Sequence, residues 1–538
     1  MSNHHVRIRR APMALAISVA LALGLASPGT RAQLFPPTAN FSNLDGNNGF
    51  AVRGAPGISF SGKPVSDAGD INGDGIDDLV VGAPFSDING YNSGSTYVVF
   101  GKAGAHDATE SLSEIDGSNG FRIDGAGSRD YSGWSVSAAG DINGDGIDDL
   151  LLGAPYAMHN GGYSGSAYVV FGKSSGFEAS FSLSTLNGAN GFRMDGVSFD
   201  DYAGDSVSGA GDVNGDGIDD LIVGAFYADT TANYSGSAYV VYGSASPFEP
   251  ALQLAALDGN NGFRIEGAIP TDWFGKSVSS AGDVNGDGIG DLIIGAPHSD
   301  GDSGYSGNSY IIFGRSLGFP ASIRVSALDE TTGLRLSGNS YSDESGLSVS
   351  AAGDINGDGI DDVIVGAWRA DNSANSSGSS YVIFGATKFP SSSLSLSSLN
   401  GSNGFRLDGV NSFDRSGKTV SGAGDVNGDG LDDLLIGAES ADADGSYAGS
   451  VFVYFGRSDA IPAVVSLGDL DGHNGMRLDG ISQGDMAGRS LSAAGDVNHD
   501  GVDDFIVGAF EADTNGVRSG SGYVVFGRKD PIFDSGFE

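Results

Sequence analysis

Short apolar segments alternate with clusters of Gly, Asn, Asp and Ser along the chain, and the same order returns every 71 residues. Four segments of the second unit have the composition of β-strands: residues 120–124, 135–139, 149–153 and 166–171. Turn-forming residues separate them, and no stretch keeps the 3.6-residue period and the caps of a helix. The pattern predicts an all-β protein with four strands in each unit and helices no longer than isolated turns.

The repeat is set by the nonapeptide Asp70–Asp78, which recurs without insertion or deletion. Its seven copies begin at Asp70, Asp141, Asp212, Asp283, Asp354, Asp425 and Asp496. Units of four strands in series are typical of propeller blades, because a closed ring of blades protects sheet edges that would otherwise pair with other chains. The sequence therefore predicts a seven-bladed β-propeller of four-stranded antiparallel blades over residues 41–529.

The composition of the strands indicates their order within a blade. The Ser-Val-Ser-x-Ala-Gly segment contains almost only small residues, which suits the crowded innermost position, and the aliphatic segment after the nonapeptide is expected to lie between sheets. A blade that starts at the small-residue strand takes its outermost strand from the following unit. Since no unit follows the seventh, residues 49–53 are expected to close the ring by pairing the N-terminal strand with the last blade.

The N-terminal residues are typical of a secretory signal peptide. Arg7, Arg9 and Arg10 precede an apolar run over residues 13–26, and Thr30-Arg31-Ala32 forms a small-x-small cleavage site. The run is shorter than the roughly 20 residues that cross a membrane, and no similar run follows, so the mature chain is expected to have no membrane span. We expect a signal peptide over 1–32, a short linker over 33–40 and a C-terminal tail over 530–538.

Charge and cysteine content narrow the function classes further. The formal net charge is -41, which argues against a nucleic-acid partner. The chain has no cysteine, so an exported form has no disulfides, and its stability must come from core burial, ring closure or metal.

Each nonapeptide has the oxygen-rich pattern of a calcium loop. Calcium takes six to eight oxygen ligands, and Asp-x-Asn-x-Asp-Gly directs carboxylate and amide oxygens to one point of a tight turn. The first, third and fifth positions supply Asp70, Asn72, Asp74, Asp141, Asn143, Asp145, Asp212, Asn214, Asp216, Asp283, Asn285, Asp287, Asp354, Asn356, Asp358, Asp425, Asn427, Asp429, Asp496, Asn498 and Asp500. The seventh position, through its carbonyl, and the ninth supply Ile76, Asp78, Ile147, Asp149, Ile218, Asp220, Ile289, Asp291, Ile360, Asp362, Leu431, Asp433, Val502 and Asp504.

The alternative for these loops is a set of metal-free Asp-Asn-Gly turns. Three carboxylates packed within ~4 to 5 Å repel by a few kcal/mol per pair at an effective dielectric near 20, and a turn has no need of that repulsion. We therefore expect up to seven structural Ca²⁺ ions. Two copies differ: Gly290 replaces Asp at the eighth position, which is not an expected ligand, and His499 replaces Gly at the fourth.

Three motifs together resemble the FG-GAP repeat of integrin alpha-subunit propellers, a repeat also found in secreted bacterial proteins. They are Phe274-Gly275, the Asp283 loop and Gly295-Ala296-Pro297. The resemblance covers all seven units and implies a seven-bladed propeller with calcium bound in strand-loop-strand hairpins. In integrins only some blades carry the calcium loop, whereas all seven carry it here. We expect no leg or membrane domain after the repeats, so the resemblance does not imply an integrin-like signalling role.

The loops at the end of the blades opposite the acidic hairpins differ from unit to unit, although their neighbours repeat. Aromatic residues gather in these loops, where they either anchor a ligand or fill gaps between blades. The candidate ligand-binding residues are Tyr131, Trp134, Tyr156, Tyr202, Tyr227, Trp273 and Trp368.

The sequence favours a binding protein over an enzyme. Its histidines occupy different places in different units, so no metal cluster or catalytic triad is indicated and no catalytic residue is expected. We expect a secreted, monomeric adhesion or ligand-binding module whose partner is an extracellular protein or glycan. The alternatives are an extracellular polysaccharide lyase or hydrolase built on a propeller, and a purely structural surface protein.

Overall fold

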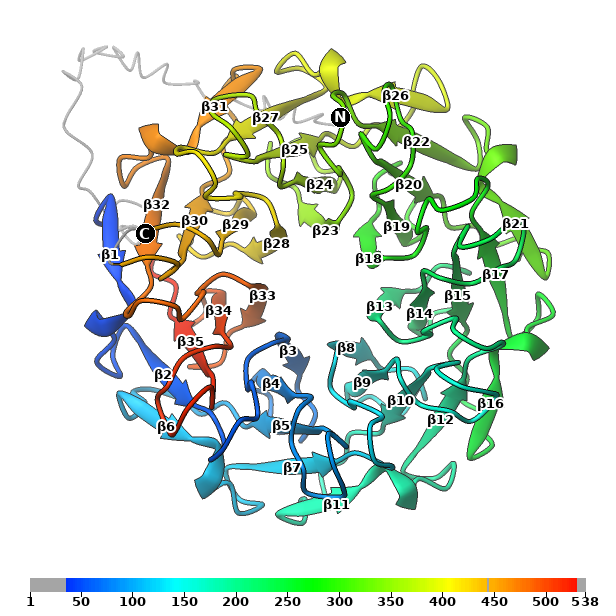
Figure 1. The fold of residues 1–538 in the computed structure, drawn as a ribbon, viewed down its shortest axis with the longest axis vertical. Helices are drawn as coiled ribbons and strands as arrows, with labels where there is room; N and C mark the ends of the chain where they lie inside the picture. Colours follow the sequence, from blue (N-terminus) through cyan, green and yellow to red (C-terminus); the bar gives the residue numbers. More distant parts are fainter. Residues whose placement is uncertain (1–34, 443–444, 530–538) are drawn as a thin grey trace, which may run out of the picture. The chain divides into compact units, whose positions relative to one another are not determined.

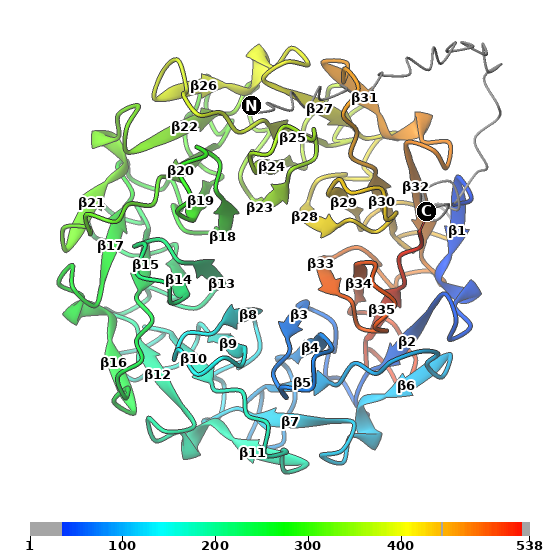
Figure 2. The same cartoon turned by 180° about the vertical axis from the view of Figure 1, so that it is seen from behind.

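The described part of this computed structural model comprises residues 35–442 and 445–529. These residues belong to one compact unit, Gln33–Glu538. The expected signal peptide and C-terminal tail lie outside them. Seven five-stranded sheets surround a common axis, as Figure 1 shows from one side and Figure 2 from the other. The innermost strands of neighbouring sheets contact one another around the complete circle, including β3 with β33. The predicted seven-bladed propeller is therefore confirmed.

Each blade presents its strands in the same order from the axis outward. The innermost strands are β3 (Val65–Gly69), β8 (Val136–Gly140), β13 (Ser206–Gly211), β18 (Ser277–Gly282), β23 (Ser348–Gly353), β28 (Thr419–Gly424) and β33 (Ser490–Gly495). The second strands are β4 (Asp78–Ala83), β9 (Asp149–Ala154), β14 (Asp220–Ala225), β19 (Asp291–Ala296), β24 (Asp362–Ala367), β29 (Asp433–Ala438) and β34 (Asp504–Ala509). The third strands are β5 (Ser95–Val99), β10 (Ser166–Val170), β15 (Ser237–Val241), β20 (Asn308–Ile312), β25 (Ser379–Ile383), β30 (Ser450–Tyr454) and β35 (Ser521–Val525).

The fourth strand of each blade comes from the following unit. These strands are β7 (Gly120–Asp124), β12 (Gly191–Asp195), β17 (Gly262–Glu266), β22 (Gly333–Ser337), β27 (Gly404–Asp408), β32 (Gly475–Asp479) and β2 (Gly49–Arg53). The first four strands of a blade are antiparallel, as the pairs β3–β4, β4–β5 and β5–β7 illustrate.

A fifth strand corrects the expected four-stranded blade. It has only three residues and pairs in parallel with the fourth strand, as β11 does with β7. The fifth strands are β11 (Ser180–Ser182), β16 (Ala251–Gln253), β21 (Ser322–Arg324), β26 (Ser393–Ser395), β31 (Val464–Ser466), β1 (Thr38–Asn40) and β6 (Thr109–Ser111). Each lies near the end of the unit that supplies the fourth strand, except β1, which comes from the segment before the first unit.

A single 3₁₀ turn follows each fifth strand and buries its first residue. These turns are η1 (Phe41–Asn43), η2 (Leu112–Glu114), η3 (Leu183–Thr185), η4 (Leu254–Ala256), η5 (Val325–Ala327), η6 (Leu396–Ser398) and η7 (Leu467–Asp469). No longer helix occurs among the described residues. None of the helices there is long and apolar enough to cross a membrane.

The N-terminal residues close the ring at two blades. Strand β2 pairs antiparallel with β35, from Gly49 opposite Val525 to Arg53 opposite Ser521, as the sequence predicts. Strand β1 lies within the segment expected to be a linker and pairs in parallel with β32 of the preceding blade. Phe41, between the two strands, is buried and stacks on Tyr523 at 4.7 Å between ring centroids. One short segment therefore joins the last two blades to the first unit.

The core consists of seven apolar layers, one between each pair of neighbouring blades. All residues of every second strand are buried, and alternate side chains enter the layers on its two sides. Val80 packs in the layer shared with the β8 blade, whereas Leu79 and Val81 pack in the layer shared with the β33 blade. This explains why the second strands are aliphatic at consecutive positions and not only at alternate ones.

Candidate functional site

The strand register gives the propeller two different ends. In the first blade Gly69 lies opposite Asp78 and Val65 lies opposite Val81. The nonapeptide loop therefore joins the innermost and second strands at one end, which we call the acidic-loop end. The turn before β3 and the turn after β4 meet at the opposite end, which we call the variable end. The same arrangement holds in all seven blades.

In each acidic loop the first carboxylate organises the backbone. The two oxygens of Asp70 accept hydrogen bonds from the backbone N–H groups of Asp74, at 2.9 Å, and Gly75, at 2.7 Å. Asp74 in turn accepts from the N–H of Ile76 at 3.0 Å. Gly75 has a φ of +89°, a conformation that favours glycine and accounts for Gly at the sixth position of every copy.

The ninth-position carboxylate lies at the buried base of the loop. Asp78 is fully buried and accepts hydrogen bonds from the Asn72 amide, at 3.2 and 3.1 Å, and from the Gly101 N–H at 2.9 Å. Burial, followed by the negative charges of Asp74 and Asp70, raises the pKa of Asp78 to about 8. The pKa values of five equivalents, Asp149, Asp220, Asp291, Asp362 and Asp504, are also raised to about 8. Burial raises the pKa of the remaining one, Asp433, well above its usual range.

The chemistry of these loops suits a hard cation, although the present side-chain arrangement is not a complete metal site. None of the ion pairs between described residues involves a ninth-position Asp. Within residues 35–442 and 445–529, no group of three or more His, Cys, Asp or Glu residues is placed to hold a metal ion. The Asn72 amide and Asp78 bond each other instead. The types of oxygen donor in the loop fit calcium. Because the present arrangement does not complete a site, calcium binding stays a prediction.

His499, which replaces Gly at the fourth position of the last loop, leaves that loop intact. It adopts a φ of +58°, close to the +71° of its equivalent Gly73. Asp496 still accepts from the N–H groups of Asp500 and Gly501, both at 2.8 Å. The cost is backbone strain, which is smaller for His than for a β-branched residue.

The eighth position has a role that the sequence did not reveal. Asp148 Oδ2 accepts a hydrogen bond from the backbone N–H of Asp70 in the neighbouring blade, at 2.9 Å. The same bond joins Asp219 to Asp141, Asp361 to Asp283, Asp432 to Asp354, Asp503 to Asp425 and Asp77 to Asp496. These six bonds connect the first position of six of the acidic loops to the next blade. The sequence shows only that the position is acidic, because the partner lies 78 residues away or across the ring closure.

The seventh bond of this series is missing at Gly290. There, the backbone N–H of Gly290 donates to the carbonyl of Asp212 at 3.1 Å, and among the described residues no eighth-position carboxylate accepts from the Asp212 N–H. A Cβ at position 290 would make only ordinary contacts, the nearest at 3.4 Å, and its φ is not positive. The seam between the β13 and β18 blades therefore has space for the aspartate that the other six seams contain.

Gly290→Asp is expected to raise the free energy of unfolding by about 1 kcal/mol, through one charge-assisted hydrogen bond and a stiffer unfolded chain. Urea unfolding at neutral pH measures the change. Gly290→Ala is the matched control, since it stiffens the backbone without supplying an acceptor. If the two variants are equally stable, the inter-blade bond contributes nothing.

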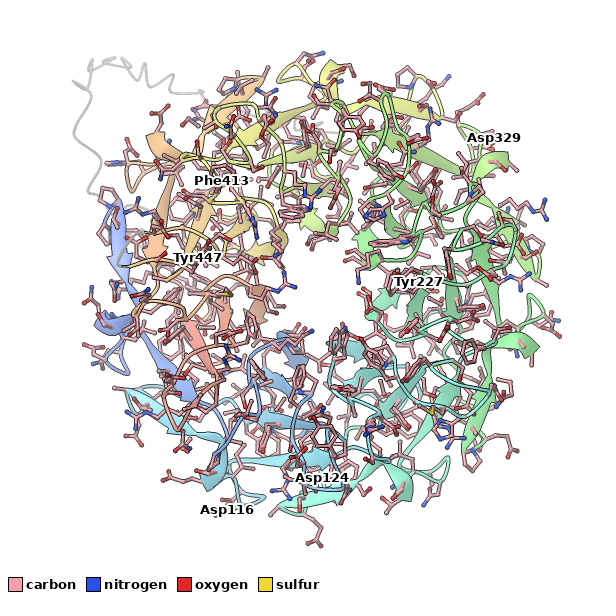
Figure 3. The ribbon with its side chains drawn as sticks, in the orientation of Figure 1. Asp116, Asp124, Tyr227, Asp329, Phe413 and Tyr447 are labelled. Carbon is pink, nitrogen blue, oxygen red and sulfur yellow. The ribbon has the colours of Figure 1, made fainter. Side chains whose placement is uncertain are left out.

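The variable end brings most of the candidate ligand-binding residues together. Aromatic rings from the turns before the innermost strands and after the second strands alternate in one continuous series across four blades, with neighbouring centroids between 3.4 and 5.5 Å apart. We call this series the aromatic arc. It consists of Phe60, Phe85, Tyr131, Tyr156, Tyr202, Tyr227, Trp273 and His298, with Trp134 beside Tyr156 at 5.6 Å. Figure 3 shows Tyr227 beside the innermost strands.

Several residues of the arc have a positive φ, a backbone conformation that glycine adopts more easily than bulky residues do. Tyr131, Tyr202 and Trp273 have φ values of +54°, +55° and +57°, and their four equivalents, Phe60, Glu344, Arg415 and Met486, also have positive φ. Bulky residues rarely adopt this conformation, which costs of order 1–3 kcal/mol at each position. Side chains that differ between units are thus kept at strained positions, and strain of this kind is concentrated at functional sites.

Trp368 lies outside the arc, in a charged part of the same end. Its Nε1–H donates to Glu344 at 3.0 Å, and Arg369, Arg415 and Lys418 lie 4.5, 5.2 and 5.2 Å from its ring centroid. The sequence places Trp368 among the other aromatic candidates, but the charges around it come from loops of two adjacent blades and are visible only in the structure.

A second set of exposed aromatic residues at the variable end was not predicted. Tyr163, Tyr234, Tyr305 and Tyr447 occupy one repeat position before the third strand, and Phe199, Tyr341 and Phe413 lie in the turns before the innermost strands. Each is more than a third exposed. Phe413 and Tyr447 lie over the blade that begins with β28 (Figure 3). The 71-residue spacing of the tyrosines was the available sequence signal.

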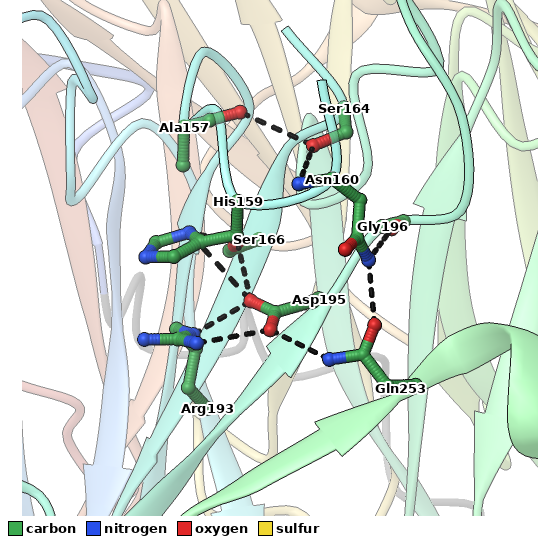
Figure 4. A network of polar contacts seen from close by, with 9 residues as sticks. All are labelled: Ala157, His159, Asn160, Ser164, Ser166, Arg193, Asp195, Gly196 and Gln253. Carbon is green, nitrogen blue, oxygen red and sulfur yellow. Dashed lines mark hydrogen bonds and ion pairs between the residues drawn. The ribbon is translucent and has the colours of Figure 1, made fainter. Parts of the chain in front are cut away.

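One cluster contains the residue types of a catalytic triad but not its geometry (Figure 4). Ser166 Oγ lies 3.1 Å from His159 Nδ1 and donates to Asp195 Oδ1 at 3.2 Å, while the same His159 nitrogen faces Asp195 at 3.6 Å. A triad histidine uses different nitrogens for the two partners, and here Ser166 is fully buried. The Ser–Asp bond also recurs in other blades, for example from Ser379 to Asp408 at 2.8 Å. The cluster therefore joins strands and is not arranged for catalysis.

Comparison with known proteins agrees with this geometry. Six segments match the FG-GAP repeat: residues 65–99, 132–170, 203–241, 274–312, 345–383 and 417–454. The chain is an FG-GAP repeat protein. Each matched segment extends from the region of an innermost strand into the third strand and so contains one acidic loop. Strands β33–β35 complete the FG-GAP ring with the same topology.

Curated relatives include integrin alpha subunits. Integrin alpha pat-2 of Caenorhabditis elegans is 30% identical over 259 residues, covering 46% of this chain and 19% of the relative. Integrin alpha-V of Gallus gallus is 30% identical over 246 residues, with 45% and 20% covered. Phosphatidylinositol-glycan-specific phospholipase D of Dictyostelium discoideum is 25% identical over 340 residues, with 60% and 34% covered. The matches thus span between a fifth and about a third of these relatives, and they support an integrin-alpha-like propeller.

Proposed function

We propose that this FG-GAP protein is an exported, calcium-stabilised propeller that binds an extracellular protein or glycan through its variable end. The aromatic arc is the main support for this proposal. On a scaffold that otherwise repeats, the residues that differ between units meet at one end, and several are kept there at strained backbone positions. Half-buried aromatic rings with polar edges are favoured anchors for proteins and sugars.

The acidic loops support the structural role proposed for calcium. Each loop concentrates three ligand carboxylates, and its ninth-position carboxyl is buried without an ion pair among the described residues. Bound calcium would neutralise the loop and stabilise the hairpin that positions the variable end of the same blade. The roles of the two ends are therefore separate: one stabilises the propeller and the other binds the partner.

A binding panel tests the proposal. The full chain, in calcium-containing buffer, is passed over immobilised collagen, fibrinogen, dextran and carboxymethyl dextran. We expect saturable binding to at least one surface, reduced tenfold or more by the double variant Tyr156→Ala with Tyr227→Ala. The matched control, Tyr156→Phe with Tyr227→Phe, keeps both rings and is expected to retain most of the affinity.

Two results of the same panel contradict the proposal. Cleavage products from a polysaccharide would favour the enzyme alternative, and binding that is unaffected by loss of the two rings would place the contact surface elsewhere. Thermal unfolding of both double variants shows whether a loss of binding reflects a loss of folding.

A further inference from the structure

At the repeat positions of the aromatic arc, the variable end has an aromatic half and a charged half. The aromatic arc occupies the blades that begin with β3, β8, β13 and β18. At the two repeat positions that carry aromatic rings in those blades, the other three blades carry four charged residues, Glu344, Arg369, Arg415 and Glu511, together with Ser440 and Met486. Charge therefore replaces aromatic surface at matching places of the same ring.

Cations gather in and beside the charged half. They come from the strained repeat position, from the position three residues after it and from the turn after a second strand, and we call them the basic cluster. The basic cluster consists of Lys63, Lys276, Arg369, Arg415, Lys418 and Arg489. It holds six of the 27 Lys and Arg residues of a chain whose net charge is -41.

Only some of these cations have acidic partners. Arg369 pairs with Glu344 at 2.7 Å, Lys276 pairs with Asp205 at 2.7 Å, and Lys418 and Arg489 share Glu439. Glu511, the remaining acid at these repeat positions, pairs with Arg518 at 2.9 Å, a cation outside the cluster.

Two members of the cluster make no ion pair with the described residues. Lys63 Nζ lies 3.3 Å from the ring centroid of Trp134, and the Arg415 guanidinium lies 5.2 Å from that of Trp368. Both are half-buried. Burial and the nearby charge of Arg489 lower the pKa of Lys63 to about 7, so an anion placed here would relieve repulsion between cations.

We infer that the variable end binds an acidic glycan, a polysaccharide that carries carboxylate or sulfate groups; this inference rests on the proposed function and specifies its ligand. The faces of sugar rings pack on aromatic rings, as the arc provides, and the anionic groups would pair with Arg415, Lys63 and the neighbouring guanidinium groups. Arginine is suited to bidentate contact with carboxylate and sulfate.

A series of polymers with one backbone tests the inference. The full chain with calcium is titrated with dextran, carboxymethyl dextran, dextran sulfate and poly-L-glutamate. We expect either or both acidic dextrans to bind at least tenfold more tightly than neutral dextran, with affinity that falls as salt is raised. The two acidic dextrans distinguish carboxylate from sulfate recognition.

Charge-removing variants locate the site. Arg369→Gln with Arg415→Gln is expected to weaken binding of the acidic dextran tenfold or more. Lys173→Gln with Lys388→Gln removes the same charge from exposed residues outside the variable end and is the matched control, expected to bind as the unaltered chain does. Unaltered thermal unfolding shows that both variants are folded.

Three results would overturn the inference: equal binding of neutral and acidic dextran, equal or tighter binding of poly-L-glutamate, or acidic-dextran binding that the arginine variants leave unchanged. The proposed function would survive the first two if binding still required the aromatic arc. It would fail separately if Tyr156→Ala with Tyr227→Ala had no effect on any ligand.

Discussion

Removal of residues 33–54 is expected to abolish the folded propeller. The deletion takes β2 from the last blade, leaves β6 without a partner and removes β1 from the preceding blade. It also removes the buried rings of Phe41 and Phe50, and loss of a buried Phe side chain alone costs about 3–5 kcal/mol. Size-exclusion chromatography and thermal unfolding are expected to show aggregated or expanded chains without a cooperative transition.

A shorter deletion, of residues 33–40, is the control for this experiment. It removes only β1 and Phe35, so the ring stays closed through β2, and a cooperative transition at reduced temperature is expected. If the longer deletion unfolds cooperatively at the temperature of the full chain, ring closure by the N-terminal strand does not stabilise the propeller.

Chelation of calcium is expected to lower the midpoint of thermal unfolding by about 10–20 °C. Each site filled at about 100 times its dissociation constant adds close to 2.7 kcal/mol, and seven such sites acting on a chain of this length give a shift of that order. Differential scanning calorimetry with excess calcium, with chelator, and with magnesium in place of calcium measures the effect. Magnesium is the control because it demands a smaller, more regular octahedral site.

The calcium effect is expected to grow as pH rises from about 4 to about 8. In the metal-free protein six of the seven ninth-position carboxyls have pKa values raised to about 8, against 3.8 for an ordinary Asp, and the pKa of Asp433 is also raised. The folded state then binds more protons than the unfolded state across this range, so metal-free stability falls as pH rises. Calcium displaces those protons, so the calcium-bound protein does not lose this stability as pH rises. A calcium-induced shift that is independent of pH would show that the buried carboxyls are not ligands.

Sequence periodicity was sufficient to predict the ring, because each unit repeats one set of contacts and a buried second strand needs apolar residues on both sides. The fifth strand could not be predicted, since three residues such as Ser180–Ser182 carry no alternation and three other strands separate them from their partner, β7. The bond from Asp148 to Asp70 was missed for a similar reason: acidity is visible in the sequence, whereas the partner backbone is not.

The candidate site was predictable only in part. Variation between units located the variable end and six residues that lie in or beside the aromatic arc. It could not distinguish Trp368 from those six, because the surroundings of Trp368 depend on Glu344 and Arg415 from other loops. At the acidic loops the donor types were evident from spacing. Their orientation was not, since Asn72 and Asp78 bond each other across the loop.

The assignment of different roles to the two ends depends on calcium occupying the acidic loops, so direct counting of bound ions is its most direct test. Isothermal titration of the metal-free full chain at pH 7, repeated in buffers of different ionisation enthalpy, gives the number of calcium ions and of protons released. We expect seven ions per chain, six for Asp78→Asn, and the release of protons on binding. Absence of calcium binding, or binding that releases no protons and is unchanged in Asp78→Asn, would contradict that assignment.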